Sequence, residues 1–483
     1  MEFFEVIVQS RSDIDEYRFY LSNACSKPIL ENNYLSPRST ECIEARQLRN
    51  LKNAPKFLVP SLLVVMLAAS ASTGYLIYSA INYNGSAPDV NVGVAFSGNT
   101  TAEAKLLIDR VKSYTNLFIL NAAGNPINRN QTMIEEICDY AVAQGLNVII
   151  NVGFNSTGDR FRSQNWFWSL SSLGDVKQRW TERWGNKFLG MYYNDEPGGI
   201  QLDGDWKTYF TWLEALDQNS PYTGRTFPPA YIIAIHDLYA IYEKIQAANG
   251  SAPAYYDEEA EFFLKNIIRE DPGFSSLKSA GFTVFTSDYC LYWFDYLGGY
   301  DVMFAQIGWN CSLAQQIDLV RGAARMQNKD WGVIITWKYG SPPYLDTGDQ
   351  IYNQMMTSYR AGADYVILFN YPIMEGNDYG LMTDEHFIAL ERFWNDAAKI
   401  RKADAHLAEA AMVLPRNYGW GMRRPDDLIW GWWGPDEKTI PLATLMSKLL
   451  AQYGTSMDII YDDQTYPIAK GGYEKIYYWN STI

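Results

Sequence analysis

Residues 301–337, DVMFAQIGWNCSLAQQIDLVRGAARMQNKDWGVIITW, form the unit that decides the fold. Two short apolar runs, at 301–306 and 332–337, flank a stretch at 312–328 whose apolar residues recur at helical spacing. Continuous apolar strands that alternate with helices are typical of parallel strands covered on both faces. The stretch therefore predicts two parallel strands joined by a helix.

The same alternation continues on both sides of this unit. Further strand-like runs lie at 92–96, 117–121, 146–152, 188–193, 282–286 and 365–370, with helical stretches at 101–114, 131–144, 169–185, 347–361 and 384–402. Eight such units in succession fit a closed barrel better than an open sheet. The predicted fold class is α/β, a (β/α)8 TIM barrel over residues 91–402. An insertion at 197–281 leaves the carboxyl end of the fourth strand, so it lies over the active-site face.

The pattern changes after the barrel. Runs at 410–414, 457–461 and 475–478 predict strands, and 440–453 predicts an amphipathic helix. Between them lies YGWGMRRPDDLIWGWWGP, rich in Trp and Gly. We expect a small C-terminal α/β domain over 403–483, packed on the barrel or on a second copy of the chain in a homo-oligomer.

A membrane segment is predicted near the amino terminus. Residues 58–81, LVPSLLVVMLAASASTGYLIYSAI, carry no charge and are long enough to cross a bilayer as a helix. Basic residues precede the segment closely, whereas the first one after it is Lys105. By the positive-inside rule, 1–57 form a cytoplasmic tail, and a linker at 82–90 leads to the exported bulk of a single-pass cell-membrane protein.

A cleaved signal peptide is the alternative to this anchor. Small residues at 68–72 follow the short apolar run, as at a cleavage site. The 57 residues ahead of the segment are too many for a signal peptide, unless the chain starts near Leu51. Export of the remainder is predicted in both cases.

Sequons and cysteines bear on the same question. Glycosylation sequons follow the membrane segment at Asn84, Asn99, Asn130, Asn155, Asn249, Asn310 and Asn480, and none precedes it. Cys290 and Cys311 follow predicted strands on one rim, so a disulfide between them is an option outside the cell. No clustered His/Cys motif or glycine-rich cofactor signature occurs, so neither a transition metal nor a cofactor is expected.

Composition limits the partners. The net charge of −15 argues against nucleic acid, which needs a basic face. Sixteen Trp and 35 Tyr supply rings that can stack on sugars or simply fill a large core.

The most informative polar residues follow the fourth strand, as Asn194-Asp195-Glu196-Pro197. Catalytic groups of barrel enzymes lie at the carboxyl ends of strands, so Glu196 is the predicted general acid. The alternative is a rim carboxylate paired with Lys338. Asp288, after the fifth strand, is the predicted second carboxylate, or else the N-cap of a helix at 291–298. Asp195 ranks third, because adjacent side chains on an extended chain point apart.

The stretch GMYYNDEPG resembles the strand-4 signature of retaining barrel glycosidases, in which an Asn-Glu-Pro carries the general acid/base. The resemblance assigns that role to Glu196 and sugar binding to Asn194, with Asp195 as an insertion. Those enzymes place a nucleophilic Glu after strand 7, where this chain has Thr-Trp-Lys-Tyr at 336–339. Residues 188–196 are also similar to the chitinase-type pattern, with Leu189 and Tyr192 in place of two acids. The C-terminal pattern loosely resembles the amidotransferase-like domain of some β-galactosidases, which supports oligomers.

Other strand ends supply binding candidates. The predicted sugar-contacting residues are Tyr193, Asn194, Trp309, Trp337, Lys338, Tyr339, Asn370 and Tyr371. The sequence thus predicts a membrane-anchored, extracytoplasmic glycoside hydrolase acting on a polysaccharide or surface glycan. The alternatives are a non-catalytic carbohydrate-binding surface protein and a barrel enzyme for non-sugar substrates.

Overall fold

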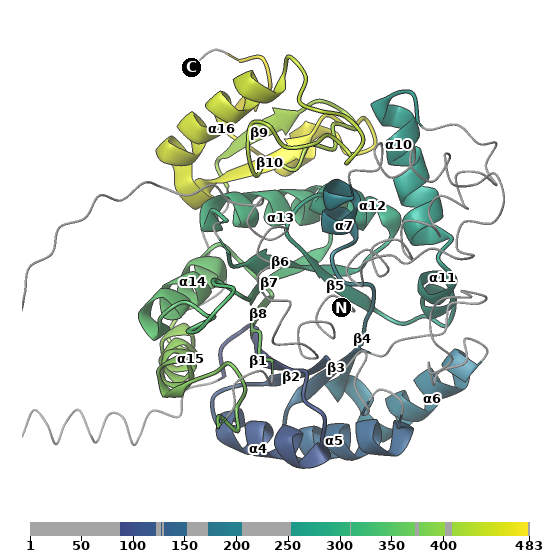
Figure 1. Cartoon of the computed structure of the whole chain (residues 1–483), viewed down its shortest axis with the longest axis vertical. Coiled ribbons are helices and arrows are strands. Elements are labelled where there is room, and N and C mark those ends of the chain that lie inside the picture. Colours follow the sequence, from purple (N-terminus) through teal and green to yellow (C-terminus); the bar gives the residue numbers. More distant parts are fainter. Residues whose placement is uncertain are drawn as a thin grey trace, which may run out of the picture. The chain divides into compact units, whose positions relative to one another are not determined.

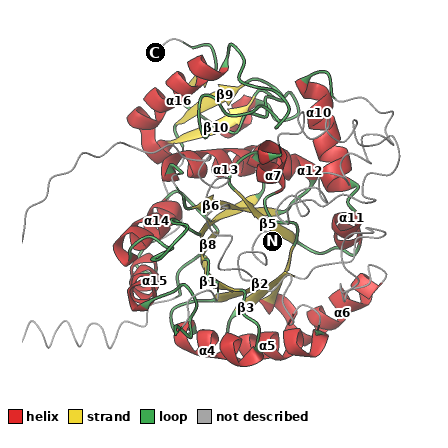
Figure 2. Ribbon diagram, viewed as in Figure 1, coloured by secondary structure: helices red, strands yellow, loops and turns green. Residues whose placement is uncertain are grey.

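The structure is a computed structural model. It describes residues 87–121, 127, 130–151, 172–204, 253–309, 311–371, 376–400 and 408–481, all of which belong to one compact unit. Eight parallel strands close into a barrel in chain order, because β1 pairs with both β2 and β8 (Figures 1 and 2). The predicted α/β barrel is confirmed.

The strands are β1 (Asn91–Phe96), β2 (Leu117–Asn121), β3 (Asn147–Asn151), β4 (Phe188–Tyr192), β5 (Val284–Asp288), β6 (Val302–Ile307), β7 (Asp330–Ile335) and β8 (Tyr365–Leu368). The outer helices are α4 (Thr101–Val111), α5 (Gln131–Ala143), α6 (Leu173–Trp184), α13 (Leu313–Gln327), α14 (Gly348–Arg360) and α15 (Asp384–Ala397). Hydroxyl and amide caps fix several helix starts; Thr100 forms a capping box with Glu103, and Ser312 caps α13.

Between β4 and β5 lie shorter helices. They are α7 (Pro197–Asp203), α10 (Tyr256–Phe262), the π-helix η5 (Phe263–Arg269) and α11 (Pro272–Ser279), and α12 (Tyr292–Gly298) follows β5. Part of the predicted insertion, residues 205–252, lies outside the described residues.

The barrel interior is filled by side chains that alternate along each strand. One apolar layer comes from every strand, for example Ile119 of β2, Phe285 of β5 and Phe304 of β6. Residues of the opposite parity face the helices and form the larger outer core. Position along a strand therefore decides whether a side chain faces the interior or the helices.

A second sheet follows the barrel, with strands in the order β10 (Met457–Tyr461), β9 (Ala410–Leu414) and β11 (Lys475–Tyr478), all parallel. The helix α16 (Thr439–Tyr453) packs on this sheet, and β10 lies against α13 of the barrel. The strands expected at these positions are present. The predicted boundary at residue 403 lies outside the described residues.

Buried charges join this sheet to the barrel. Arg321 of α13 donates from Nε to Asp458 of β10 at 2.6 Å, and it also pairs with Asp318 at 3.3 Å. All three side chains are almost fully buried. Such a group holds its geometry because an unpaired charge here would be costly.

Among the described residues, no helix is long and apolar enough to cross a membrane. The predicted tail at 1–57, the predicted span at 58–81 and most of the predicted linker lie outside them.

We expect Arg321→Met to destabilise the protein by about 3–5 kcal/mol, because Asp458 stays buried but loses its ion pair with Arg321. Arg392→Met is the matched control, since Arg392 pairs with Asp349 on the surface and its loss should cost less than about 1 kcal/mol. Urea unfolding followed by tryptophan fluorescence measures both. Equal losses in the two variants would contradict a structural role for the buried pair.

Candidate functional site

A β-bulge in β4 sets the geometry of the site. Val148 of β3 pairs with Phe188, but the next residue, Ile149, pairs with Gly190, so one residue of β4 is skipped. Gly190 has φ +151°, and a Cβ there would lie 2.2 Å from the carbonyl oxygen of Thr283. Glycine is therefore required at this point of the strand.

The bulge determines which tyrosine faces the barrel. After the skipped residue, Tyr192 lies in the interior layer, stacked on Phe304 with ring centroids 6.5 Å apart. Tyr193 points the other way, and its hydroxyl donates to Asp271 at the start of α11 at 2.7 Å. The structure thus places Tyr193, a predicted sugar contact, against the helices.

The loop after β4 turns two adjacent carboxyl groups toward the mouth. Asn194 and Glu196 both have φ 56°, so the chain is not extended here and the expectation that Asp195 and Glu196 diverge does not hold. The Asn194 carbonyl accepts a hydrogen bond from the Thr286 hydroxyl at 2.7 Å, which fixes the turn. Left-handed non-glycine residues are strained and cluster at functional sites.

Hydrogen bonds link the two carboxyl groups through β5 and β6. Gln306 Nε2 donates to Glu196 Oε1 at 2.7 Å and to Ser287 Oγ at 3.0 Å. Ser287 Oγ in turn donates to Asp195 Oδ1 at 2.8 Å, and the Tyr192 hydroxyl contacts the same carboxyl oxygen. Asp195 and Glu196 thus belong to one network at the barrel mouth.

Glu196 carries a perturbed carboxyl group. Burial, aided by the charges of Asp195 and Asp288, raises its pKa to about 8, although the Gln306 hydrogen bond acts in the opposite direction. Glu196 therefore stays protonated at neutral pH. A carboxylic acid that keeps its proton in a cleft is suited to donate it.

Asp288 does not reach this network. Ser287 faces the barrel interior, so its neighbour Asp288 faces outward and is fully buried. Its carboxylate accepts from the backbone N–H of Gly198 at 2.6 Å and of Gly199 at 3.0 Å, and from that of Tyr289 at 2.7 Å. Asp288 therefore caps α7, not a helix at 291–298, and its carboxylate lies outside the hydrogen-bond network of Asp195 and Glu196.

Uncharged polar side chains form the floor of the mouth. Each of them lies two positions after an apolar residue of the interior layer, and all are buried. They are Ser97, Asn121, Asn151, Ser287, Gln306 and Thr336. Asn151 Nδ2 donates to Asn121 Oδ1 at 2.6 Å. Sequence reasoning missed these residues, although a polar residue two positions after an interior one on a strand was the available signal.

The predicted aromatic contacts divide into buried and exposed rings. Trp337 is buried and packs on Phe369 and Tyr371, with ring centroids 5.9 and 6.1 Å apart. Trp309 and Tyr339 are 37% and 43% exposed. A ligand can stack on the exposed pair directly, whereas Trp337 supports the half-buried Tyr371 from behind.

Two polar candidates have structural partners. Asn370 Oδ1 accepts from the Leu381 backbone N–H at 2.9 Å and so holds the loop after β8. Lys338 is half-buried, and its backbone N–H donates to the Tyr344 carbonyl at 2.7 Å. Both Lys338 and Glu196 are described, and no ion pair joins them.

The disulfide that the sequence left as an option is absent, because Cys290 and Cys311 are both free. Cys290 is buried beside Asp288, with Sγ 3.8 Å from Oδ1, whereas Cys311 is partly exposed. Of the sequon asparagines, those that the structure describes, Asn99, Asn130 and Asn480, are exposed. Asn84, Asn155, Asn249 and Asn310 lie outside the described residues. In the described part of the chain, no His, Cys, Asp and Glu side chains gather as a metal site.

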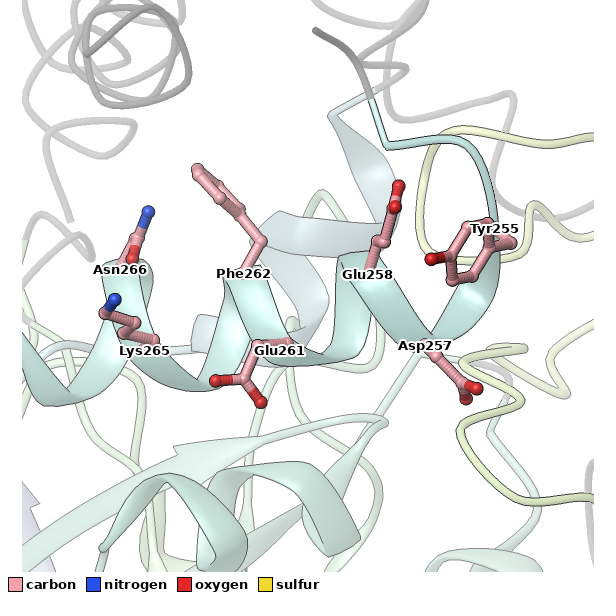
Figure 3. A pocket seen from close by; sticks show the side chains of 7 residues that line it. All are labelled: Tyr255, Asp257, Glu258, Glu261, Phe262, Lys265 and Asn266. Carbon is pink, nitrogen blue, oxygen red and sulfur yellow. The ribbon is translucent and has the colours of Figure 1, made fainter. Parts of the chain in front are cut away.

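An open hollow of about 390 Å³ lies on α10 and η5, and Figure 3 shows the side chains that line it. Its lining residues are Tyr255, Asp257, Glu258, Glu261, Phe262, Lys265 and Asn266. None of them belongs to a barrel strand or to the network around Glu196. This hollow is therefore separate from the candidate active site.

No protein-family model and no curated protein matches the chain. Among solved structures, it is similar to GH5_18 from Streptomyces cattleya in complex with GlcNAc, at 11% identity and a TM-score of 0.47 over 82% of this chain and 99% of that one. A β-galactosidase from the Antarctic haloarchaeon Halorubrum lacusprofundi shows 12% identity and a TM-score of 0.49 over 80% and 69%. At these values the likeness concerns the barrel fold alone.

We expect Glu196→Gln to stabilise the protein at alkaline pH. Between the ordinary glutamate pKa and about 8, the folded state holds a proton that the unfolded state lacks, so the stability contributed by Glu196 falls as pH rises. The Tm difference between variant and parent should therefore grow from about pH 5 to about pH 9, by at least ~2 °C. Differential scanning calorimetry measures it.

The control is Glu136→Gln, which removes an exposed carboxyl paired with Lys105 on the barrel surface. No pH-dependent gain is expected there. A Tm difference for Glu196→Gln that is the same at both pH values would show that Glu196 is not held protonated.

Proposed function

We propose that the chain is a glycoside hydrolase with Glu196 as general acid. The observation that carries this proposal is the Glu196 carboxyl group at the barrel mouth, which is held by Gln306 and linked through Ser287 to Asp195, and whose pKa is raised to about 8. Cleavage of a glycosidic bond needs a proton donor to the leaving oxygen and a second carboxylate. The site supplies both from one loop.

In this reaction Glu196 donates its proton to the glycosidic oxygen as the bond to the anomeric carbon breaks. Asp195 is the second carboxylate, acting directly on the anomeric carbon or through a water molecule. The Gln306 amide can stay bonded to Glu196 Oε1 while Oε2 faces the substrate, so the acid keeps its orientation through proton transfer.

The floor of the mouth indicates the substrate class. Hydroxyl and amide side chains such as Asn121, Asn151 and Thr336 can donate to and accept from sugar hydroxyls. Trp309 and Tyr339 expose rings that can stack on a sugar face. The net charge of −15 disfavours polyanions. A neutral polysaccharide or surface glycan is therefore the proposed substrate.

We also propose that this activity is displayed outside the cell from a single membrane anchor. The support is the uncharged segment at 58–81 with its preceding basic residues, together with the exposed sequon residues Asn99 and Asn480. A mobility shift on enzymatic deglycosylation of the full chain would test it. Accessibility of the barrel to added protease in intact cells is the second readout.

The exposed rings of Trp309 and Tyr339 also suit the alternative, a non-catalytic carbohydrate-binding protein. Such a protein needs stacking rings but no protonated carboxyl group. The raised pKa of Glu196 favours the enzyme, because an acid that keeps its proton at neutral pH can transfer it to a leaving oxygen.

We expect the full chain, purified in detergent, to hydrolyse members of a panel of neutral polysaccharides and aryl glycosides. The rate should fall as pH rises through about 8, because the acid must be protonated. Glu196→Gln should lower kcat on unactivated substrates by at least ~100-fold. Glu136→Gln should match the parent.

Asp195→Asn separates the two carboxyl roles. It keeps the size of the side chain but removes the second carboxylate, so we expect a loss of at least ~100-fold. One outcome would overturn the proposed enzymatic function. The parent would bind a glycan without hydrolysing it, and this binding would survive Glu196→Gln but be lost in Trp309→Ala. The protein would then be a lectin-like barrel.

A further inference from the structure

The orientation of Glu196 depends on the helix that follows it. Pro197 is the first residue of α7, so the backbone of Glu196 is continuous with the helix start. Its N–H donates to the Ser287 carbonyl at 3.0 Å, and its carbonyl accepts from Ile200 of α7 at 2.8 Å. A shift of α7 would therefore move the Glu196 carboxyl relative to Gln306.

The first turn of α7 is held by β5. Asp288 caps its first turn through the N–H groups of Gly198 and Gly199. Both glycines pack so closely that a Cβ at Gly199 would lie 2.2 Å from the Tyr289 ring. This end is anchored to β5, but the last turn lies farther along the chain, against the region that follows the barrel (Figure 1).

The other end is held by residues 418–435, hereafter the tryptophan-rich segment. Gln201 Nε2 donates to the Trp430 carbonyl at 2.8 Å. Arg423 donates from Nη1 to Asp203 Oδ1 at 2.6 Å. A Cβ at Gly421 would lie 2.7 Å from Leu202 Cδ1, so the Leu202 side chain packs closely against the backbone of Gly421. Three consecutive residues of α7 thus touch this segment.

Arg423 is the charged link in this contact. Besides Asp203, its guanidinium forms a bidentate pair with Asp427, at 2.8 and 2.7 Å, and it lies over the Tyr289 ring at 5.6 Å. Asp203 also accepts from the Tyr289 hydroxyl. One planar guanidinium therefore joins α7, Tyr289 after β5 and the tryptophan-rich segment, a geometry that Lys cannot reproduce.

The segment itself is rigid enough to serve as an anchor. Trp430 has φ 58°, and its indole Nε1 donates to the Asn417 carbonyl at 2.8 Å. Its ring packs on Phe294 of α12 and on Phe263 of η5, with centroids 4.6 and 5.6 Å apart. Gln315 of α13 donates to the Met422 carbonyl at 3.0 Å, next to Arg423.

We propose that Arg423 is a positioning residue for the proposed acid: through Asp203 and α7, the tryptophan-rich segment keeps the Glu196 carboxyl in its place at the barrel mouth. The region after the barrel then completes the active site without contacting the substrate. This inference rests on the proposed function for its catalytic consequence, but the placement of Glu196 can be measured without any activity.

The first experiment is a double-mutant cycle in the full chain. It measures how much Glu196→Gln raises the Tm at alkaline pH, first in the parent and then in variants of Arg423. If Arg423 keeps the Glu196 carboxyl in its place, that gain shrinks to less than half in an Arg423→Met background. It stays unchanged in Arg424→Met, the matched control, whose side chain pairs instead with Asp426. An unchanged gain in Arg423→Met would overturn the proposal, even if the Tm itself falls.

Asp203→Asn provides a milder second variant. It weakens the α7 contact but leaves the Arg423–Asp427 pair intact, and Asp203 is half exposed, so the variant should fold. The Glu196→Gln gain should shrink here too. If it shrinks in Arg423→Met only, Arg423 acts through the fold of the segment and not through α7, and the proposal fails.

Kinetics give the catalytic readout. We expect kcat to fall about 10- to 100-fold in Arg423→Met with KM changed less than about 3-fold, because a misplaced acid affects the transition state more than binding. Arg423→Lys should recover only part of the loss. A KM increase at constant kcat would contradict the positioning role. If the parent hydrolyses nothing while the Tm cycle shows coupling, the proposed function fails and the placement of Glu196 by Arg423 stands.

Discussion

The alternation of side chains along the barrel strands is the constraint on which the site depends. Neighbouring residues of a strand face opposite sides, so adjacent polar residues have different surroundings. Ser287 lies in the mouth and bridges the two carboxyl groups, whereas Asp288 lies behind the wall and caps α7. In β4 the bulge at Gly190 resets the alternation, and Tyr192 faces the interior as a result.

Placing an acid at this mouth has a cost in stability. Burial raises the pKa of Glu196 to about 8 and that of Asp288 to about 7, and it raises the pKa of Asp295 and Glu259 well above the ordinary range. Four carboxyl groups thus resist ionisation around α7, and folding loses free energy as pH rises. Backbone donors to Asp288 and the Gln201 amide on Glu259 offset part of that cost.

The sequence was sufficient for the barrel but not for the site. Apolar runs located all eight strands, because a closed barrel needs continuous burial on both faces. The predicted fifth strand ended at Thr286, yet β5 runs to Asp288, so the side chain placed on the rim is inside the wall. The low rank of Asp195 as a catalytic residue rests on an extended backbone, whereas Asn194 and Glu196 both have φ 56°. A bulge and two left-handed residues depend on tertiary contacts that periodicity does not reveal.

The position of Asp195 and Glu196 depends on a series of contacts that runs from β4 to the C-terminal sheet. Gly190 directs β4, and the strained turn after it directs Asp195 and Glu196 into one network. The helix α7 that continues this turn is held by Asp288 at its first turn and by Arg423 at its last. The sheet that follows the barrel is fixed in turn, because β10 packs on α13 through the buried Arg321–Asp458 pair. The C-terminal region of the chain therefore helps to hold Glu196 at the barrel mouth. Strain at the turn can persist only because both anchors are rigid.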